Sequence, residues 1–552
     1  MSQNKPWIDQ YAAGVPAEVG TLKYNSVADM LLTACDKYKD QPSFENFGKS
    51  ITYGELDQLS AQFAAFLQSK FKTGDSIALM MPNVLQYPIA VLGVLRAGMV
   101  VTNVNPLYTP RELKHQLNDS EAKAIVVIEN TACTLAEVIE ETGVETVITA
   151  TIGEMIGGIK GGLMNFVIKH VKKMVPAFSI AGTITFKQAL NQGKMLKHTD
   201  VERSLDDIAF LQYTGGTTGV SKGAMLTNRN LVANVAQVEH WIKSEINDAQ
   251  EVVITALPLY HIFALTANCL TFSTYGAHNI LITNPRDMKG FVKELSKHQF
   301  TVMTGVNTLF NGLLITEGFK DLDFSKFKFT LGGGMAVQKD TALRWKEVTG
   351  STLAEAYGLT ETSPAACINP IPLKEYNGTI GLPLPSTDCQ IQDDDGNPLG
   401  VGEPGELCIK GPQVMLGYLK RPDETSKTIV DGWLKTGDVA CMDEKGYFKI
   451  VDRKKDMILV SGFNVYPNEI EDAACLHPHI VECAAVGLKD EKSGEIVKLF
   501  VVKVTECDLD EAAVKAHCRD NLTGYKVPKI IEFRDDLPKS NVGKILRKDL
   551  RE

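Results

Sequence analysis

The chain has 552 residues, of which 44% are hydrophobic and 22% are charged, so it can bury a sizeable core and is not intrinsically disordered. Its 57 Lys and Arg against 67 Asp and Glu give a net charge of −10, which argues against a nucleic-acid partner. The 11 cysteines are scattered without a CxxC pair, a pattern typical of reduced cytoplasmic thiols rather than disulfides or a zinc site. The first residues contain no apolar segment typical of a signal peptide. We therefore expect a soluble, cytoplasmic protein of several domains.

Short β-branched runs alternate with helical patterns in the first part of the chain. Strands are predicted at 76–81, 99–104 and 124–128, with helices at 85–97 and from 109 onward. Thr109 as N-cap, Pro110 in the first turn and Glu112 at the third position predict where the last of these helices begins. Such alternation is typical of βαβ units and a parallel, doubly wound sheet.

The same alternation recurs from Glu251 onward. Strands are predicted near 252–256, 279–283, 301–304 and 328–331. The stretch 252–285 has no Asp, Glu, Lys or Arg, but polar residues, Gly and Pro interrupt it, so we expect a buried strand–helix–strand unit rather than a membrane span. The sequence thus predicts two αβ halves within one large domain.

The composition changes after about Asn377, where Gly and Pro become frequent. Short strands at 389–392, 406–410 and 448–451 predict a small antiparallel barrel or sheet over about 377–452. Beyond the charged cluster 452–456, strands at 484–488 and 497–504 and helices at 467–475 and 509–519 predict a separate α+β domain. We therefore predict an N-terminal domain over 1–452 and a C-terminal domain over 453–552, with a hinge near Asp452.

The segment 213–223 (YTGGTTGVSKG) has the composition of a phosphate-binding loop. Its three inner glycines let the backbone approach a ligand, its hydroxyls supply donors and Lys222 adds a positive charge. The spacing does not fit a Walker A motif. Taken alone, the segment is explained equally well as a flexible glycine-rich loop.

Further motifs follow in order: LGGG at 331–334, YGLTET at 357–362, DGWLKTGD at 431–438, DRK at 452–454 and KSNVGK at 539–544. Together with the loop they resemble the adenylate-forming superfamily of acyl-CoA synthetases, luciferases and peptide-synthetase adenylation domains. The resemblance covers nearly the whole chain. It implies a large AMP-binding domain and a smaller, mobile C-terminal domain.

The resemblance implies activation of a carboxylate by ATP to an acyl-adenylate and pyrophosphate, followed by transfer to the thiol of CoA. It implies Mg²⁺ as cofactor, held by Glu361, and ATP and CoA as co-substrates. The implied ATP- and AMP-binding residues are Tyr213, Thr214, Gly215, Gly216, Thr217, Thr218, Gly219, Lys222, Gly333, Gly334, Tyr357, Gly358, Thr360, Glu361, Asp438 and Arg453. The implied catalytic residues are Lys544, Glu361, Thr214 and Lys222, and Gly462 and Phe463 are implied at the CoA channel.

Several segments are similar to those of bacterial long-chain fatty acid–CoA ligases, namely 103–113, 258–263, 431–455, 460–470 and 522–528. This similarity implies a long-chain fatty acid as substrate, for degradation or lipid synthesis, with His261 at the acyl pocket; a buried structural histidine explains His261 nearly as well. Residues 362–364 (TSP) depart from the Cys-Ala-Pro associated with that group, which puts the acyl pocket more in doubt than ATP binding.

Three other functions stay open at this point. A medium-chain or aryl-CoA ligase would differ in substrate, and an adenylation domain would serve a carrier protein. A fatty-acid-binding protein without catalysis is disfavoured by the joint presence of the charged motif residues Lys222, Glu361, Asp438, Arg453 and Lys544.

The segment 163–175 (LMNFVIKHVKKMV) predicts a basic amphipathic helix, with Met164, Val167, Val171 and Met174 on one face. Such a helix can lie at the cytoplasmic face of the inner membrane, or pack on the domain surface. The two explanations are equally good from sequence. A homodimer is likewise left open.

Overall fold

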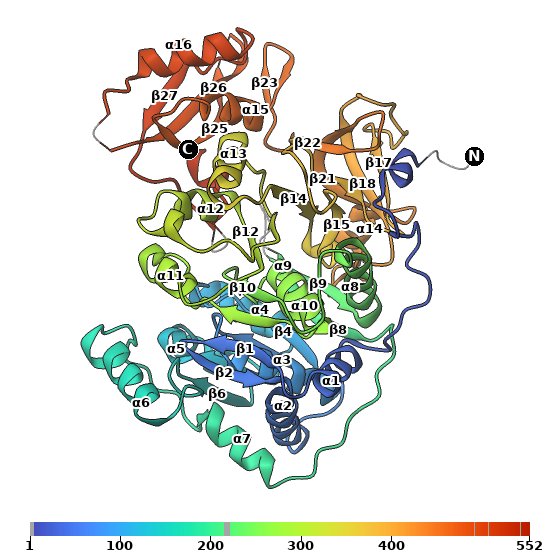
Figure 1. The fold of residues 1–552 in the computed structure, drawn as a ribbon, viewed down its shortest axis with the longest axis vertical. Coiled ribbons are helices and arrows are strands. Elements are labelled where there is room, and N and C mark those ends of the chain that lie inside the picture. The colour runs from blue at the N-terminus through green and yellow to red at the C-terminus, as the bar shows by residue number, and fades with distance from the viewer. Residues whose placement is uncertain (1–4, 215–220, 491, 506, 541–542, 552) are drawn as a thin grey trace.

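The computed structural model describes residues 5–214, 221–490, 492–505, 507–540 and 543–551. It is a mixed α/β structure in which four sheets are seen in the described chain, with a large N-terminal part and a smaller C-terminal domain above it in Figure 1. All 11 cysteines carry free thiols.

The first sheet has the order β19-β9-β8-β4-β3-β5-β6-β7. Its strands are β3 Ser76–Met80, β4 Val100–Asn103, β5 Ala124–Ile128, β6 Thr146–Ala150, β7 Ile184–Thr185, β8 Ile208–Thr214, β9 Lys222–Thr227 and β19 Gly417–Tyr418. Strands β8, β4, β3, β5, β6 and β7 run parallel, and β9 and β19 add antiparallel at the edge. The strands predicted at 76–81, 99–104 and 124–128 are therefore confirmed.

Helices flank this sheet: α1 Val27–Lys37, α2 Tyr53–Gln68, α3 Gln86–Arg96, α4 Pro110–Asp119, α5 Ala132–Ala136, α6 Gly158–Phe166, α7 Phe186–Lys194 and α8 Asn228–Ile242. The start of α4 is as predicted. The backbone N–H of Thr109 donates to the Glu112 carboxylate at 2.8 Å, and the N–H of Glu112 donates back to the Thr109 hydroxyl.

The second sheet has the order β16-β15-β14-β13-β12-β10-β11-β1-β2. Its strands are β1 Pro42–Asn46, β2 Lys49–Thr52, β10 Val252–Thr255, β11 His278–Leu281, β12 Val302–Gly305, β13 Phe329–Gly332, β14 Leu353–Gly358, β15 Ala365–Ile368 and β16 Leu382–Pro383. The repeat predicted from Glu251 onward is confirmed. The N-terminal hairpin β1–β2 also joins this sheet, through parallel pairing of β1 with β11, which the sequence did not predict.

Helices α11 Met288–Leu295, α12 Asn307–Leu314 and α13 Lys339–Thr349 connect the strands of the second sheet. Between β10 and β11 the chain forms α9 Ile262–Ala264, a π-helical turn over Leu265–Thr271 and α10 Phe272–Thr274, almost wholly buried. The predicted strand–helix–strand unit is thus present. Across the described residues, we find no helix with the length and apolar character needed to cross a membrane.

The β-rich segment is an antiparallel five-stranded sheet of β17 Asp388–Gln392, β18 Gly405–Lys410, β20 Ile429–Val430, β21 Trp433–Met442 and β22 Phe448–Arg453, with α14 Pro422–Thr428 beside it. The C-terminal domain contains β23 Ile458–Val460, β24 Phe463–Val465, β25 Ile480–Asp490, β26 Gly494–Lys503 and β27 Ile530–Phe533, with α15 Pro467–Ala474 and α16 Glu511–Asn521. Its central apolar side chains form a cluster separate from the main core.

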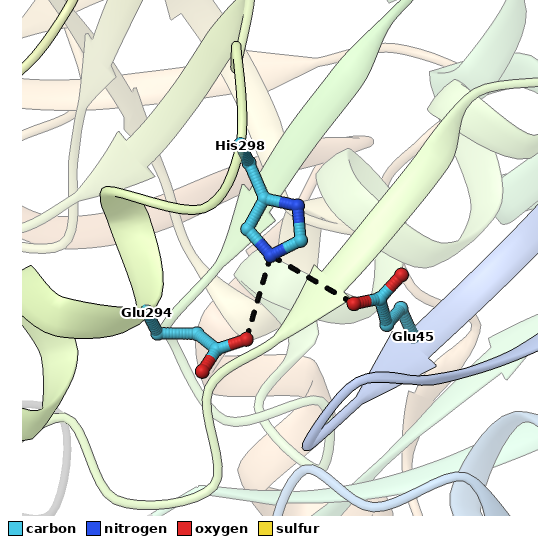
Figure 2. A group of neighbouring side chains, drawn as sticks. All are labelled: Glu45, Glu294 and His298. Carbon is cyan, nitrogen blue, oxygen red and sulfur yellow. Dashed lines mark hydrogen bonds and ion pairs between the residues drawn. The ribbon is translucent and has the colours of Figure 1, made fainter.

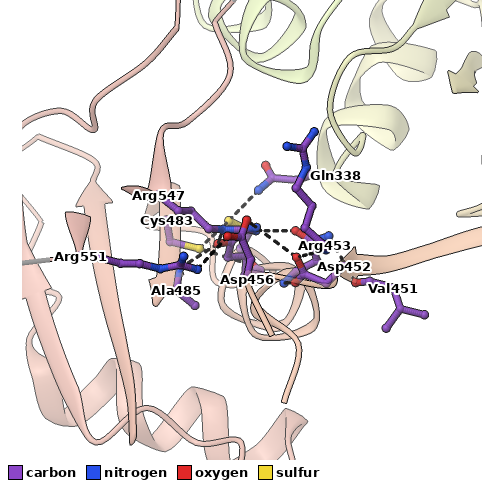
Figure 3. A network of polar contacts seen from close by, with 12 residues as sticks. Gln338, Val451, Asp452, Arg453, Asp456, Cys483, Ala485, Arg547 and Arg551 are labelled. Carbon is purple, nitrogen blue, oxygen red and sulfur yellow. Dashed lines mark hydrogen bonds and ion pairs between the residues drawn. The ribbon is translucent and has the colours of Figure 1, made fainter. Parts of the chain in front are cut away.

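A buried ion network surrounds Asp452, the last residue but one of β22 (Figure 3). Arg547 lies 3.2 Å from the Asp452 carboxylate and 2.7 Å from that of Glu471, and Arg551 lies 2.8 Å from Asp456. Burial raises the pKa of Asp452 to about 6. The network ties the end of the chain, which carries Lys544, to the residues at the predicted hinge.

Candidate active site

A tyrosine, an aspartate and an arginine meet where the second sheet approaches the antiparallel sheet. Tyr357, near the end of β14, donates its hydroxyl to Asp438 Oδ2 at 2.6 Å. Asp438 on β21 stands directly opposite Arg453 on β22, and Arg453 Nε lies 3.4 Å from Asp438 Oδ1. Asp438 is only 6% exposed. The arrangement offers fixed hydrogen-bond acceptors and a cation to a polar ligand.

Glycines allow the backbone to approach closely around this group. A Cβ added at Gly358 would lie 1.9 Å from the carbonyl oxygen of Pro364, and one at Gly333 would lie 3.1 Å from that of Ala356. Gly334, with φ of +76°, turns the chain after β13, in the region that favours glycine. Thr360 lies in the short 3₁₀ turn Thr360–Thr362 that follows β14.

The predicted phosphate-binding loop connects β8 to β9. Thr214 ends β8 and pairs with Lys222, which begins β9, so both ends of the loop are fixed by one antiparallel ladder. Residues Gly215, Gly216, Thr217, Thr218 and Gly219 lie outside the described residues. Tyr213 is buried, and its hydroxyl donates to Asp119 at 2.7 Å.

Tyr418 connects two of the predicted site residues. Its hydroxyl donates to Glu361 Oε1 at 2.6 Å, and Lys222 Nζ lies 4.4 Å above its ring. Lys222 also lies 3.0 Å from the Glu424 carboxylate. Glu361 and Tyr418 line a cavity of about 320 Å³.

Lys544 reaches the site from the C-terminal domain. The N–H of Lys544 donates to Ser540 Oγ at 3.1 Å, and its carbonyl accepts from the N–H of Ser540 at 2.7 Å. The preceding Gly543 carbonyl accepts from Thr308 Oγ1 of α12 at 3.1 Å, across the two domains. The pKa of Lys544 is lowered to about 8, mainly by burial and next by the positive charge of Arg453. Lys544 therefore lies within electrostatic range of the Tyr357–Asp438–Arg453 group.

His261, the residue predicted at the acyl pocket, is the N-cap of α9. Its pKa is lowered to about 4, first by burial and then by the charge of Lys544, so the imidazole is neutral at pH 7. Its Nδ1 accepts a weak hydrogen bond from the N–H of Phe263 at 3.4 Å. His261 therefore lies within electrostatic range of Lys544.

The predicted CoA residues do not join this group. Phe463 is 55% exposed, and its ring stacks on Tyr525 of the same domain with centroids 4.7 Å apart. Gly462 adopts φ of +84°, and nothing lies within 4 Å of a Cβ added there. In this orientation of the C-terminal domain Lys544 is at the site, and Gly462 faces open space.

Sequence reasoning missed Tyr418, Glu424, Asp119 and Thr308. Tyr418, Glu424 and Asp119 contact predicted site residues, and Thr308 contacts Gly543, the neighbour of Lys544. Tyr418 is 57 residues from Glu361, and Thr308 is 235 residues from Gly543, so only the fold brings these pairs together.

Residues 31–419 match the family described as AMP-binding enzyme, and residues 469–544 match the AMP-binding enzyme C-terminal domain. The chain belongs to the AMP-binding enzyme family. It is 54% identical over 550 residues to a long-chain-fatty-acid–CoA ligase of Escherichia coli O6:H1, covering 99% of this chain and 98% of the relative. A ligase of the same name from Bacillus subtilis is 36% identical, with 100% and 98% coverage.

Solved structures agree with the fold of this family member. ATP-bound MatB from Rhodopseudomonas palustris gives a TM-score of 0.82 at 29% identity, covering 95% of this chain and 98% of that one. An anthranilate CoA ligase in complex with anthranoyl-AMP gives a TM-score of 0.85 over 97% of this chain and 98% of that one, and at 21% identity this likeness concerns the fold alone. The predicted α/β class, with a large N-terminal and a smaller C-terminal domain, is confirmed.

Proposed function

We propose that the protein converts long-chain fatty acids to acyl-CoA in two steps, forming an acyl-adenylate and pyrophosphate from ATP and then a thioester and AMP with CoA. The observation that carries the proposal is that Lys544 of the C-terminal domain lies within electrostatic range of Asp438 of the N-terminal domain and of Arg453 at the boundary between them. Full-length identity of 54% to a long-chain-fatty-acid–CoA ligase supports the choice of acid. A medium-chain or aryl-CoA ligase is the second candidate.

The first step joins two anions, so neutralising charge is its main demand. Lys544 places an ammonium where the fatty carboxylate meets the α-phosphate of ATP. Because its pKa is about 8, most of the lysine is protonated at pH 7. Lys222 and Thr214, with the loop between them, hold the leaving pyrophosphate.

The nucleotide is held on the other side of the reacting phosphate. Asp438 accepts hydrogen bonds from the ribose hydroxyls, with Arg453 directed at the same sugar. The adenine is framed by Gly333, Gly334, Tyr357, Gly358 and Thr360. At Gly358 only glycine fits, because a side chain there would collide with the backbone. Tyr357, hydrogen-bonded to Asp438, keeps that carboxylate oriented.

Glu361 is the residue that would hold Mg²⁺. A hard carboxylate beside a phosphate site suits this ion, which commonly takes one or two protein carboxylates together with substrate phosphates. Tyr418 donates to Oε1 of Glu361 and thereby fixes the carboxylate, which lines a cavity. When bound, Mg²⁺ neutralises phosphate charge.

The second step requires a different orientation of the C-terminal domain. Gly462 has nothing within 4 Å of an added Cβ, and Phe463 is exposed and stacks on Tyr525 of its own domain. We therefore propose that the domain turns about Asp452, withdrawing Lys544 and bringing Gly462 to a channel for CoA. The domain boundary at 452/453 belongs to this proposal. The neutral imidazole of His261, followed by the buried helical segment 262–274, borders the acyl pocket.

Mass spectrometry of products from ATP, Mg²⁺ and carboxylic acids from acetate to oleate, with and without CoA, tests the proposal. We expect AMP together with palmitoyl- or oleoyl-CoA only when CoA is present. Preference for octanoate or benzoate would favour the second candidate. Acyl-adenylate without transfer to CoA, or no AMP, would contradict the proposed function.

A second proposal concerns the membrane, and the surface of α6 and of the segment 167–174 that follows it supports it. Five large apolar side chains are exposed here: Ile159 by 91%, Leu163 by 60%, Phe166 by 56%, Val171 by 65% and Met174 by 50%. Met164 and Val167, predicted on the same face as Val171, are half-buried, whereas Val171 is exposed. A π-helical turn over Val167–Val171 changes the helical periodicity between Val167 and Val171. Lys169, Lys172 and Lys173 are exposed nearby. We propose that this face, at the edge of the molecule in Figure 1, docks peripherally on an anionic lipid surface.

Flotation with phosphatidylglycerol-containing vesicles tests this docking. Replacing Leu163 and Phe166 by Gln, or the three lysines by Gln, should shift protein from the vesicle fraction to the soluble one. Ile315→Gln, at a 64%-exposed residue of another surface, is the matched control. Flotation unchanged in both variants would end this role for α6. A homodimer remains a prediction.

A further inference from the structure

A cluster of two glutamates and a histidine lies outside the proposed active site. Glu45 is on β1, Glu294 on α11 and His298 in the turn after α11. One ligand atom from each lies within 4.8 Å of the others, and within the described chain no other set of three or more His, Cys, Asp or Glu side chains has this spacing. Figure 2 shows the His298 ring directed between the two carboxylates.

The fold brings these residues together from segments far apart in sequence. Strand β1 pairs in parallel with β11, with Glu45 opposite Ile280, and α11 follows β11 along the chain. Glu294 lies in the last turn of α11, and the chain after the helix brings His298 within 3.4 Å of it. The site depends on the N-terminal hairpin joining the second sheet.

The distances suit a metal ion with short bonds. His298 Nε2 lies 3.4 Å from Glu294 Oε1 and 3.8 Å from Glu45 Oε1. Tetrahedral zinc with bonds of about 2.0–2.2 Å separates neighbouring ligand atoms by about 3.3–3.6 Å. The two distances from His298 are within about half an ångström of this range, and the two carboxylate oxygens lie within 4.8 Å of each other. The carboxylates would approach each other around a bound ion, and a water molecule can take the fourth position.

Neighbouring side chains orient the carboxylates. His278 Nε2 lies 3.4 Å from Glu45 Oε2, so Oε1 is left for the cluster. Lys297 pairs with Glu294 Oε2 at the surface and likewise leaves Oε1. Partners of this kind outside the ligand set usually fix a metal ligand in its binding orientation.

The cluster is accessible from solvent. His298 and His278 line a surface depression of about 630 Å³. The side chains of His298, Glu45 and Glu294 are 13%, 16% and 17% exposed. A cation therefore has an entry path to ligands that are otherwise shielded.

We propose that Glu45, Glu294 and His298 bind a divalent transition-metal ion of the zinc class, with His278 as a positioning residue. One nitrogen and two carboxylate oxygens match the donor preference of zinc better than that of Mg²⁺, which favours oxygen alone. The ion would tie the N-terminal hairpin β1–β2 to α11. The alternative is a protonated His298 that forms ion pairs with both carboxylates and binds no metal.

Titration of the full-length, EDTA-treated protein with Co²⁺, without nucleotide, tests the site. We expect one equivalent to give the visible absorption of tetrahedral Co²⁺, and Zn²⁺ to abolish it by displacement. His298→Gln and Glu294→Gln should lower the affinity by at least about 100-fold, and His278→Gln by about 10–100-fold. Zn²⁺ should raise the melting temperature of the unmodified protein but not that of His298→Gln.

His477→Gln is the matched control. His477 lies among the rings of His479 and His517, at 5.6 and 5.1 Å between centroids, and such a group could bind Co²⁺ loosely. The control should leave the Co²⁺ signal unchanged. The proposal is overturned if the signal is absent, if it persists in His298→Gln and Glu294→Gln with unchanged affinity, or if His477→Gln removes it. Thermal melting of the metal-free variants shows whether a variant has lost only a metal ligand or has also lost its fold.

Discussion

Few contacts position Lys544. Its surroundings determine its pKa and therefore its charge state. Its hairpin touches the larger domain through the hydrogen bond from Thr308 to Gly543, and burial lowers its pKa to about 8. A lysine in this setting is a strong electrostatic partner for phosphate, because little water screens it.

Replacing Lys544 by Ala should lower the rate of acyl-adenylate formation by roughly 10²–10³-fold, because no other group then bridges the two anions. The hairpin backbone bonds to Ser540 do not involve the side chain, so folding should be kept. ATP–pyrophosphate exchange measures this step alone. Near-normal exchange in the variant would remove Lys544 from the mechanism.

The lowered pKa of Lys544 also predicts a pH dependence. A lysine is charged below its pKa, so the contribution of Lys544 to kcat/KM of adenylation should decline as pH rises through about 8. Activity of the unmodified protein divided by that of Lys544→Ala should therefore fall between about pH 7 and pH 9.5. The ratio cancels the titration of substrates and of other groups. A constant ratio over this range would show that Lys544 does not titrate as described.

At the scale of single elements, the end of β14 is the most constrained part of the site. Gly358 lies between Tyr357, which contacts Asp438, and the turn that carries Glu361. A Cβ here would lie 1.9 Å from the backbone of Pro364, and backbone atoms cannot move aside as a side-chain end can.

We expect Gly358→Ala to destabilise the protein by about 1–3 kcal/mol and to lower adenylation by about 10²-fold, because both flanking site residues are displaced. Thermal melting and pyrophosphate exchange measure the two effects. Gly143→Ala, where a Cβ meets nothing within 4 Å and φ is not positive, is the matched control. Equal behaviour of the two variants would mean that the β14 turn tolerates a side chain.

Helices and strands that are marked by their own residue types or periodicity were predictable from the sequence. The capping box at Thr109 and the strand Ala124–Ile128 follow from residue type and periodicity, and both are present. The pairing of β1 with β11 was not predictable, because the partners are more than 230 residues apart and β1 alone carries no mark of its neighbour. For the same reason the ordered motifs indicated Lys222 and Glu361 but not Tyr418, which links them.

At the scale of the whole molecule, the C-terminal domain holds Lys544 in one defined orientation. The ion pair of Arg547 with Glu471 anchors the chain end within that domain, so Lys544 must move together with the domain. Arg547 also pairs with Asp452 at the predicted hinge (Figure 3). Contacts to the larger domain, such as Thr308 to Gly543 and Asn311 to Val481, are single hydrogen bonds. The ion pair that crosses the boundary lies at the hinge itself, and the contacts away from the hinge are single hydrogen bonds, so rigid-body rotation about Asp452 is favoured.

A disulfide between Thr308→Cys and Gly543→Cys would fix this orientation. The Thr308 Cβ and a Cβ built on Gly543 are 3.9 Å apart, close to the mean of about 3.8 Å in disulfides. The positive φ of Gly543 makes cysteine strained there, so the reduced double variant and both single variants are the references.

The most direct test of the account is a single-turnover measurement of both half-reactions in this oxidised double variant, with non-reducing electrophoresis to show that the bond survives CoA. We predict acyl-adenylate formation close to that of the reduced variant, and acyl-CoA formation slower by about 10²-fold until dithiothreitol is added. Acyl-CoA formed equally fast with the bond intact would contradict the claim that one site serves both steps through two orientations of the C-terminal domain.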